Sequence, residues 1–219
     1  MGELKPDLSL WRHGLGVVPD EVWLRTDLRT LVLADNALTE VSERIGNLRN
    51  LRMLDLGHNK LRELPSGIGN LEGLSDFLYL HDNRLTQLPE SLSRLQRLRY
   101  LNISENAFEL FPEVVTTMRS LIELRVTGNR LTELPPSISR LTSLRELHLR
   151  NNKLATLPDS VCALRELRQI DLRGNPVIGL PEGLLTLPGL EKLDLRWVTT
   201  LEPPPWFSKL EAQGCIVYL

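Results

Sequence analysis

Histidine and carboxylate side chains recur at a fixed spacing in the first half of this 219-residue chain. Asp35, His58, Asp82 and Glu105 are 23 or 24 residues apart, and His81 directly precedes Asp82. Imidazole and carboxylate groups are ligands that zinc takes in proteins. If the spacing brings His58, His81 and Asp82 together, they could hold a divalent metal. The alternative is that they are solvated ends of strands, and we predict no metal site and no cofactor.

Motifs for catalysis are absent from the sequence. It contains no GxxxxGK[ST] phosphate loop, no GxSxG elbow, no HExxH and no GxGxxG. Cys215 could be considered as a nucleophile, but no segment of the chain is left over to form a catalytic domain around it. We therefore predict that the protein is not an enzyme.

The regular spacing comes from a repeat that runs through the chain. Leu144–Leu154, LRELHLRNNKL, reads L-x-x-L-x-L-x-x-N-x-L and continues as x-x-L-P-x-x-Φ-x-x-L, where Φ is apolar. Its asparagine recurs every 23 or 24 residues, as Asn36, Asn59, Asn83, Asn106, Asn129, Asn152 and Asn175. A fixed period in this range is the sequence signature of a solenoid.

Each repeat predicts one short strand and one helical turn. The leucines of its L-x-L core alternate with polar residues, which is the period of a strand with one buried face. The LPxxΦ half, such as Leu64–Ile68, predicts a short helical or 3-10 turn after a proline. The asparagine amide can both donate to and accept from the backbone of the neighbouring turn, so we expect a buried ladder of asparagines.

These motifs resemble those of leucine-rich repeat proteins of the intracellular 23-residue type, from about Leu8 to Leu219. The resemblance implies an α/β solenoid: a right-handed horseshoe with a parallel sheet on its concave face and short helical turns on its convex face. It also implies a protein-binding role without identifying the partner. Similar repeats occur in Ras-pathway scaffolds, in plant proteins and in bacterial effectors. The recognition subunit of an effector or a ubiquitin-ligase-type assembly is therefore an alternative.

We predict a single domain over residues 1–219. Residues 1–27 form a degenerate first repeat and cap, 28–197 the regular repeats, and 198–219 a C-terminal cap closed by a strand near its end. One interval is irregular, because an extra residue lies within Ser75–Phe77. It predicts either a β-bulge that re-aims side chains near a site or a length change absorbed in a turn.

The third, fifth and seventh residues of each repeat are expected to face the concave side, since side chains alternate along a strand. In the first half they predict partner-binding residues that are mostly aromatic or apolar: Trp11, Val32, Met53, Phe77, Tyr79, His81, Tyr100 and Asn102. Such a cluster is typical of a binding hot spot, although aromatic residues also suit strands. In the second half the candidates lie among alternating charges: Arg125, His148, Arg150 and Arg173. These charges either pair across strands or orient an acidic or mixed-charge partner.

Composition excludes several classes of partner. The net charge of −2 and the pI of about 6.1 argue against nucleic acid, and no apolar run is long enough to span a membrane. There is no apolar signal-peptide segment, and the two cysteines are far apart. We therefore predict a cytoplasmic protein, with secretion as an effector left open. A monomer that binds a protein partner is expected. A concave-face homodimer and a solenoid that binds a metal or small molecule are the alternatives.

Overall fold

The computed structural model describes residues 5–219 and divides the chain into two compact units at the bond between Ala107 and Phe108. Residues 1–4, which belong to the predicted cap over 1–27, lie outside the described residues. The single domain over 1–219 and its cap boundaries stay a prediction.

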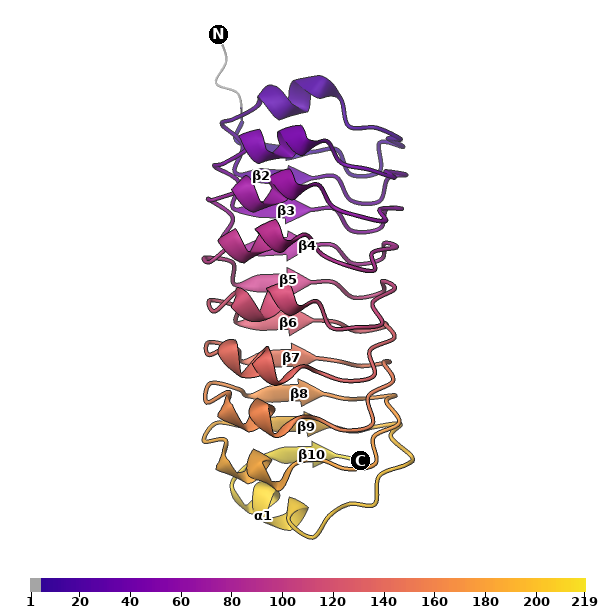
Figure 1. Ribbon diagram of the computed structural model, residues 1–219, viewed down its shortest axis with the longest axis vertical. Helices are drawn as coiled ribbons and strands as arrows, with labels where there is room; N and C mark the ends of the chain where they lie inside the picture. The colour runs from indigo at the N-terminus through magenta and orange to yellow at the C-terminus, as the bar shows by residue number, and fades with distance from the viewer. Residues whose placement is uncertain (1–4) are drawn as a thin grey trace. The chain divides into compact units, whose positions relative to one another are not determined.

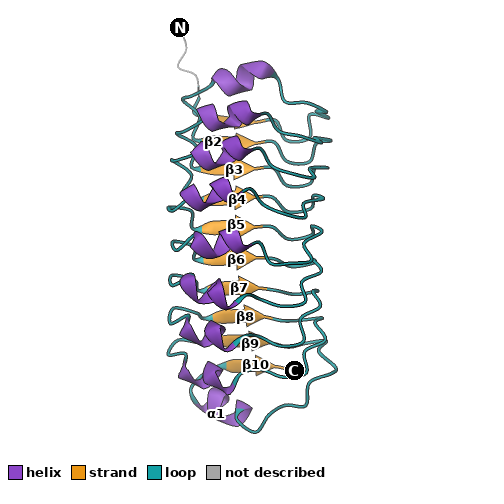
Figure 2. Ribbon diagram, in the orientation of Figure 1, coloured by secondary structure: helices purple, strands orange, loops and turns teal. Residues whose placement is uncertain are grey.

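The first unit contains a parallel sheet whose strands follow one another in chain order (Figure 1). The strands are β1 Asp7–Ser9, β2 Thr30–Val32, β3 Met53–Asp55, β4 Phe77–Tyr79 and β5 Tyr100–Asn102. Opposite the strands lies a row of 3-10 helices (Figure 2). These helices are η1 Asp20–Leu24, η2 Glu43–Asn47, η3 Ser66–Asn70 and η4 Glu90–Arg94.

The second unit repeats this arrangement, with successive parallel strands on one side and helices on the other (Figure 2). Its strands are β6 Glu123–Arg125, β7 Glu146–His148, β8 Gln169–Asp171, β9 Lys192–Asp194 and β10 Ile216–Tyr218. Its helices are η5 Glu113–Thr117, η6 Pro136–Arg140, η7 Asp159–Ala163, η8 Glu182–Thr186 and the α-helix α1 Phe207–Ala212. Both units confirm the predicted α/β fold class, with parallel strands opposite 3-10 turns.

Leucine fills the core of each unit. The middle residue of a strand, such as Leu54 in β3 or Leu147 in β7, is fully buried, while its neighbours on both sides are partly exposed. The apolar residue of the LPxxΦ segment, such as Ile68 in η3, closes the same layer from the other side and is also fully buried. A proline precedes most of the helices and sets an extended backbone at their start, as at Pro65.

The asparagine ladder forms as predicted. Asn59 is buried, and its Nδ2 donates to the carbonyl oxygens of Leu33, Leu56 and Gly57 at 3.0–3.1 Å. Its Oδ1 accepts from the backbone N–H of Leu38 at 3.1 Å. One side chain thus satisfies backbone groups of its own repeat and of the preceding one, where the strand hydrogen bonds have ended.

The residue before the asparagine has a left-handed backbone in most repeats. Among these residues is His58, with φ of 51°, and glycine occupies this position at Gly128 and Gly174. In the last repeat, where Val198 replaces the asparagine, Trp197 has the same conformation, with φ of 65°. Only glycine adopts this conformation without cost, while Asn, Asp and His are the side chains that tolerate it best. Asp35, His58, Asp82 and Glu105, which recur at a fixed spacing in the sequence, all occupy this position and are therefore first of all turn residues.

The extra residue of the third repeat lies in the bend at Ser75–Asp76, before β4 begins at Phe77. The backbone N–H of Arg99 donates to the Ser75 oxygen at 3.0 Å, one residue earlier than the regular pattern, and β4 keeps its register with β3 and β5. The insertion is thus absorbed ahead of the strand, and the side chains of β4 still alternate as in the other repeats.

The end of the second unit is closed by α1 and β10. Trp206 and Phe207 are buried and meet edge to face, with ring centroids 4.7 Å apart. Strand β10 pairs in parallel with β9, where the sequence predicted a closing strand. Over the described residues, 5–219, the structure contains no helix of the length and apolarity needed to cross a membrane.

Candidate functional site

Three aromatic rings of β4 and β5 form one cluster on the open face of the first unit's sheet. Phe77 and Tyr79 are stacked, with centroids 5.8 Å apart and planes 10° apart. Tyr100 contacts both, with centroid distances of 5.4 Å to Phe77 and 5.1 Å to Tyr79. We call Phe77, Tyr79 and Tyr100 the aromatic cluster.

The strand register explains why these rings meet. Phe77 pairs directly with Tyr100 on one side and Met53 on the other, and all three flank the buried leucines of their strands. Side chains at these positions point away from the leucine core, so packing of the core does not require large rings there. Phe77 remains 40% exposed, and the other two rings are half-buried.

A histidine pair extends the aromatic cluster. The His81 ring lies 6.0 Å from Tyr79 and 4.7 Å from His58, in both cases edge to face. His58 Nδ1 lies 2.6 Å from Asp82 Oδ2, while His81 Nδ1 is buried and has no hydrogen-bond partner among the described residues. Burial, followed by the nearby His58, lowers the pKa of His81. The neutral form of the His81 ring is therefore favoured beside the cluster.

Asp55 is the carboxylate that borders these rings, directly opposite Tyr79 in the register. Its Oδ1 accepts the backbone N–H of Gly57 at 2.9 Å. Burial raises the pKa of Asp55, and that hydrogen bond only partly opposes the rise. The border of the aromatic cluster is thus acidic but poorly solvated.

The structure groups most of the residues predicted for the first half. Met53, Phe77, Tyr79, His81 and Tyr100 form one continuous surface through the register and the ring contacts above. Val32 and Asn102 lie on the same face, opposite Asp55 and Tyr79 respectively. Trp11 does not join them, because its exposed ring stacks on Arg12, whose guanidinium carbon lies 4.6 Å from the ring centroid.

In the second unit the sheet face carries a network of ion pairs. Arg173 and Arg196 form two-pronged hydrogen bonds to Asp171 and Asp194 respectively, with distances of 2.6–2.9 Å. Asp194 is buried, and Lys192 Nζ lies 3.5 Å from it. Burial would raise the pKa of Asp194, but the hydrogen bonds from Arg196 together with the charges of Arg173 and Arg196 lower it. The charges of this face therefore pair with each other, but mainly between residues two apart in one repeat, whereas the prediction was pairing across strands. Arg173 also reaches across to the next strand, where its Nε lies 3.6 Å from Asp194 Oδ2.

Arg150 differs from its neighbours. Its guanidinium lies over the ring of Trp197 at 4.8 Å from the centroid, and that of Arg173 lies 5.7 Å from the same ring. No carboxylate pairs with Arg150 in the described part of the chain, and its Nε is buried without a hydrogen-bond partner. Trp197 is 61% exposed, so the arginine and the indole lie at the surface together.

These charges surround one hollow of about 250 Å³ within the second unit. It brings together the four residues predicted for this half with five others: Arg125, Thr127, His148, Arg150, Gln169, Ile170, Asp171, Arg173 and Lys192. Its charged lining is mostly basic, with one carboxylate, that of Asp171.

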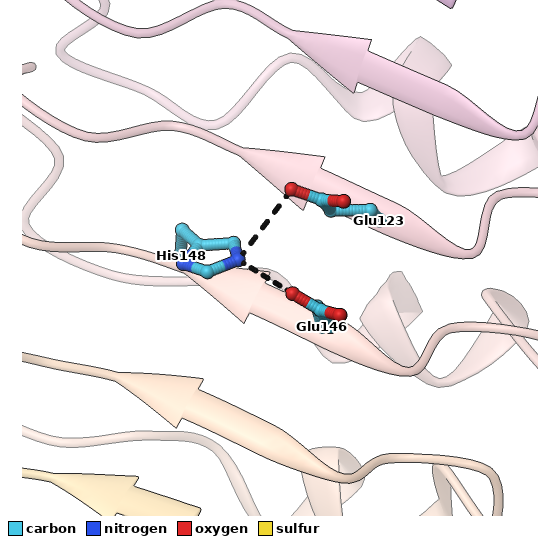
Figure 3. Close-up of side chains that lie close together, drawn as sticks. All are labelled: Glu123, Glu146 and His148. Carbon is cyan, nitrogen blue, oxygen red and sulfur yellow. Dashed lines mark hydrogen bonds and ion pairs between the residues drawn. The ribbon is translucent and has the colours of Figure 1, made fainter.

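The arrangement of possible metal ligands differs from the one considered in the sequence. Among the described residues, the three groups whose ligand atoms converge within 4.8 Å are Glu123, Glu146 and His148, on β6 and β7 (Figure 3). His148 Nε2 lies 3.1 Å from Glu146 and 3.6 Å from Glu123. Arg125 already binds Glu123 at 2.5 Å, so one of the two carboxylates of this trio has a cationic partner of its own. His58 and Asp82 form a pair of their own in the other unit.

Sequence reasoning missed Trp197, and it placed Asp194 among the alternating charges of this face without predicting that Asp194 is buried. Both belong to the last repeat, in which Val198 replaces the asparagine. Asp35 and His58 directly precede the asparagine of their repeats. The corresponding residue of the repeat after Asn175 is Trp197, so the spacing could have found it. Only the structure shows that the ring of Trp197 lies against Arg150, which follows strand β7.

Comparison with families of known proteins gives two overlapping matches. The family described as "Leucine-rich repeat region" matches residues 20–126, and the family described as "Leucine rich repeat" matches residues 119–177. Together they cover residues 20–177. No curated protein matches the sequence.

Solved structures give further matches. The leucine-rich repeat domain of the type III effector XCV3220 (XopL) is 27% identical with a TM-score of 0.82, over 94% of this chain and 73% of that one. The ectodomain of the Arabidopsis thaliana receptor kinase GASSHO1/SCHENGEN3, in complex with CASPARIAN STRIP INTEGRITY FACTOR 2, is 32% identical with a TM-score of 0.71. PEPR1–AtPEP1 is 29% identical with a TM-score of 0.67. The match with GASSHO1/SCHENGEN3 covers 88% of this chain but only 26% of that one. The match with PEPR1 covers 80% of this chain but only 29% of that one.

Proposed function

The chain is a leucine-rich repeat protein, and from that premise we propose that it is a non-enzymatic module that binds a protein partner over the aromatic cluster. The observation that carries the proposal is the contact of Phe77, Tyr79 and Tyr100 on the sheet face, where the fold does not need them. Aromatic side chains that lie together at a partly exposed surface are the usual anchors of protein interfaces.

The surroundings of the cluster support the same proposal. Met53 adds an adaptable apolar side chain next to Phe77, and such side chains suit binding surfaces. His58, Asp55 and Asp82 border the rings with polar groups, as in an interface with an apolar centre and a polar rim. Two of the similar structures are complexes, GASSHO1/SCHENGEN3 with CASPARIAN STRIP INTEGRITY FACTOR 2 and PEPR1 with AtPEP1, which supports a protein or peptide ligand in general.

The test is a pull-down with the full chain and with Tyr79→Ala plus Tyr100→Ala. We expect the double variant to keep its circular dichroism spectrum and to lose the partners that the parent retains. The matched control is Val17→Ala plus Leu24→Ala, which removes two exposed apolar side chains outside the strands and should leave every partner bound. If the tyrosine variant is folded and keeps every partner, the proposed site is wrong.

Homodimerisation through the same face is the competing use of the cluster. Light scattering separates the two, because a homodimer through the rings would have twice the mass of the chain and would dissociate in the tyrosine double variant. A monomer at all concentrations would remove the homodimer.

The similarity to the XopL domain favours a second candidate, the recognition part of an effector. In that role the cluster would bind a protein of a host cell rather than one of the producing cell. Parallel pull-downs from the two kinds of lysate distinguish the candidates, provided that the capture depends on Tyr79 and Tyr100. The cytoplasmic location stays a prediction.

A further inference from the structure

We infer that the hollow around Arg150 is a binding site for one carboxylate, supplied by an aspartate or glutamate side chain of a partner protein. The site lies within residues 108–219 and goes beyond the proposed function, which rests on the aromatic cluster in the other unit.

Most of the cationic side chains around Arg150 are already paired with carboxylates. Arg173 is held by Asp171, Arg125 by Glu123, and both Arg196 and Lys192 by Asp194. Arg150 has neither an ion pair nor a side-chain hydrogen bond in the described part of the chain. It is thus the guanidinium left over after its neighbours have paired.

Leaving the Arg150 guanidinium without a hydrogen-bond partner costs free energy. Arg150 Nε is buried without a partner, and a buried polar group without a hydrogen bond is unfavourable. The ring of Trp197 covers one side of the guanidinium and limits its movement. A planar guanidinium held in this way presents its N–H groups as a fork, which matches the two oxygens of a carboxylate.

The hollow has the size of a single side chain. At about 250 Å³ it is smaller than the sites that enclose whole small-molecule ligands, which measure roughly 300–1,000 Å³. It can admit one acidic side chain while the backbone that bears it stays outside. Thr127 and Gln169 in the lining offer neutral hydrogen-bonding groups to such a side chain.

The single unpaired arginine favours a ligand with one negative charge. A carboxylate carries one negative charge and matches the single unpaired arginine. Asp171 in the lining repels any anion, and it repels a phosphate more strongly than a carboxylate because a phosphate carries more negative charge. The balance therefore favours a carboxylate over a phosphate group.

The experiment follows the Nε–Hε signal of Arg150 and the indole N–H signal of Trp197 by NMR in the ¹⁵N-labelled full chain. The probe is N-acetylglutamate α-methylamide, whose only charge is the side-chain carboxylate, and its neutral match is N-acetylglutamine α-methylamide. We expect saturable shifts of both signals with the glutamate probe, and binding of the glutamine probe at least about tenfold weaker.

Two further probes test the source of the anion. N-acetylalanine carries a free main-chain carboxylate, and inorganic phosphate carries the alternative anion. Both should bind more weakly than the glutamate probe. Tighter binding of either one, or shifts with the glutamate probe that never saturate, would overturn the inference.

Variants tie the binding to the named residue. Arg150→Gln should abolish the saturable shift of Trp197, whereas Arg140→Gln, an exposed arginine on η6, should leave it unchanged. If Arg150→Gln does not fold, Arg150→Lys keeps the charge but loses the fork, and should weaken binding about tenfold. Undiminished binding in a folded Arg150 variant would also contradict the site. The tyrosine double variant should bind the probe as the parent does, so failure here and failure of the proposed function are distinguishable.

Discussion

The imidazole rings of His58 and His81 meet edge to face, with centroids 4.7 Å apart, although 23 residues separate them in the chain. The His81 ring also lies directly above Gly57, where a Cβ atom would collide with it. The glycine thus makes room for a histidine from the next repeat. This contact fixes His81 in a half-buried position beside Tyr79, and its protonation state then matters for stability.

Stability is expected to fall at mildly acidic pH because of His81. Its pKa is lowered in the folded protein, so the unfolded chain, with a histidine pKa of about 6.5, binds the proton more tightly. The stability is therefore full above that value and is lost as pH falls through it toward the folded pKa. His58, Asp55 and Asp82 are the titratable groups that face His81. Urea unfolding at several pH values should show a smaller acid loss of stability for His81→Gln than for the parent, and equal losses would contradict this account.

Asp55→Asn is expected to stabilise the protein slightly at neutral pH. Burial raises the pKa of Asp55, so its ionised form is disfavoured in the folded state. Asn102 shows that the amide serves equally well at this position, because its Oδ1 accepts the N–H of Ser104 at 3.0 Å. The sign follows from the raised pKa: the advantage of the variant is present at neutral pH and disappears as pH falls through the folded pKa of Asp55 toward about 3.9. A melting temperature below that of the parent at pH 7 would contradict this account.

Asn106→Ala is expected to destabilise the protein by about 1–3 kcal/mol, because it leaves backbone groups without partners. Asn106 donates to the carbonyl oxygens of Leu80, Ile103 and Ser104, and accepts from the N–H of Leu85. Chemical denaturation measures the loss. Tyr79→Ala, which removes ring contacts at the surface, should cost less.

Asn47→Ala is the matched control for that prediction. Asn47 is exposed at the end of η2, so its loss should change the free energy of unfolding little. Equal costs for Asn106→Ala and Tyr79→Ala would show that the ladder is not the stronger constraint.

Cys215 is expected to be unreactive in the folded protein. It is buried, and burial raises the pKa of its thiol to about 11. At neutral pH its thiolate fraction is then about a hundredfold lower than that of an ordinary cysteine, and thiolate is the reacting form. In the Cys162→Ser variant, a thiol reagent should label Cys215 only as fast as the protein unfolds. Rapid labelling under native conditions would contradict the buried placement.

The repeat, the fold class and the role of the asparagines follow from the amino-acid sequence alone. These properties depend on short-range rules that each repeat obeys alone: leucines with period two, a proline before a turn, and an amide that bonds to the nearest free backbone groups. Because the residues of neighbouring strands share the same offsets, the grouping of Met53, Phe77, Tyr79 and Tyr100 could also be predicted from spacing.

Which side chains of the sheet face pair with each other depends on the tertiary structure. Trp11 was predicted beside the aromatic cluster but stacks on Arg12 instead, and Trp197 reaches Arg150 although 46 residues lie between them. Long side chains can extend across more than one strand, and their direction depends on charges and rings that neighbouring repeats supply. The repeat period determines the position of every Cβ atom. The direction of a long side chain depends in addition on the charged and aromatic groups around it. These groups determine which arginine is left without a carboxylate partner.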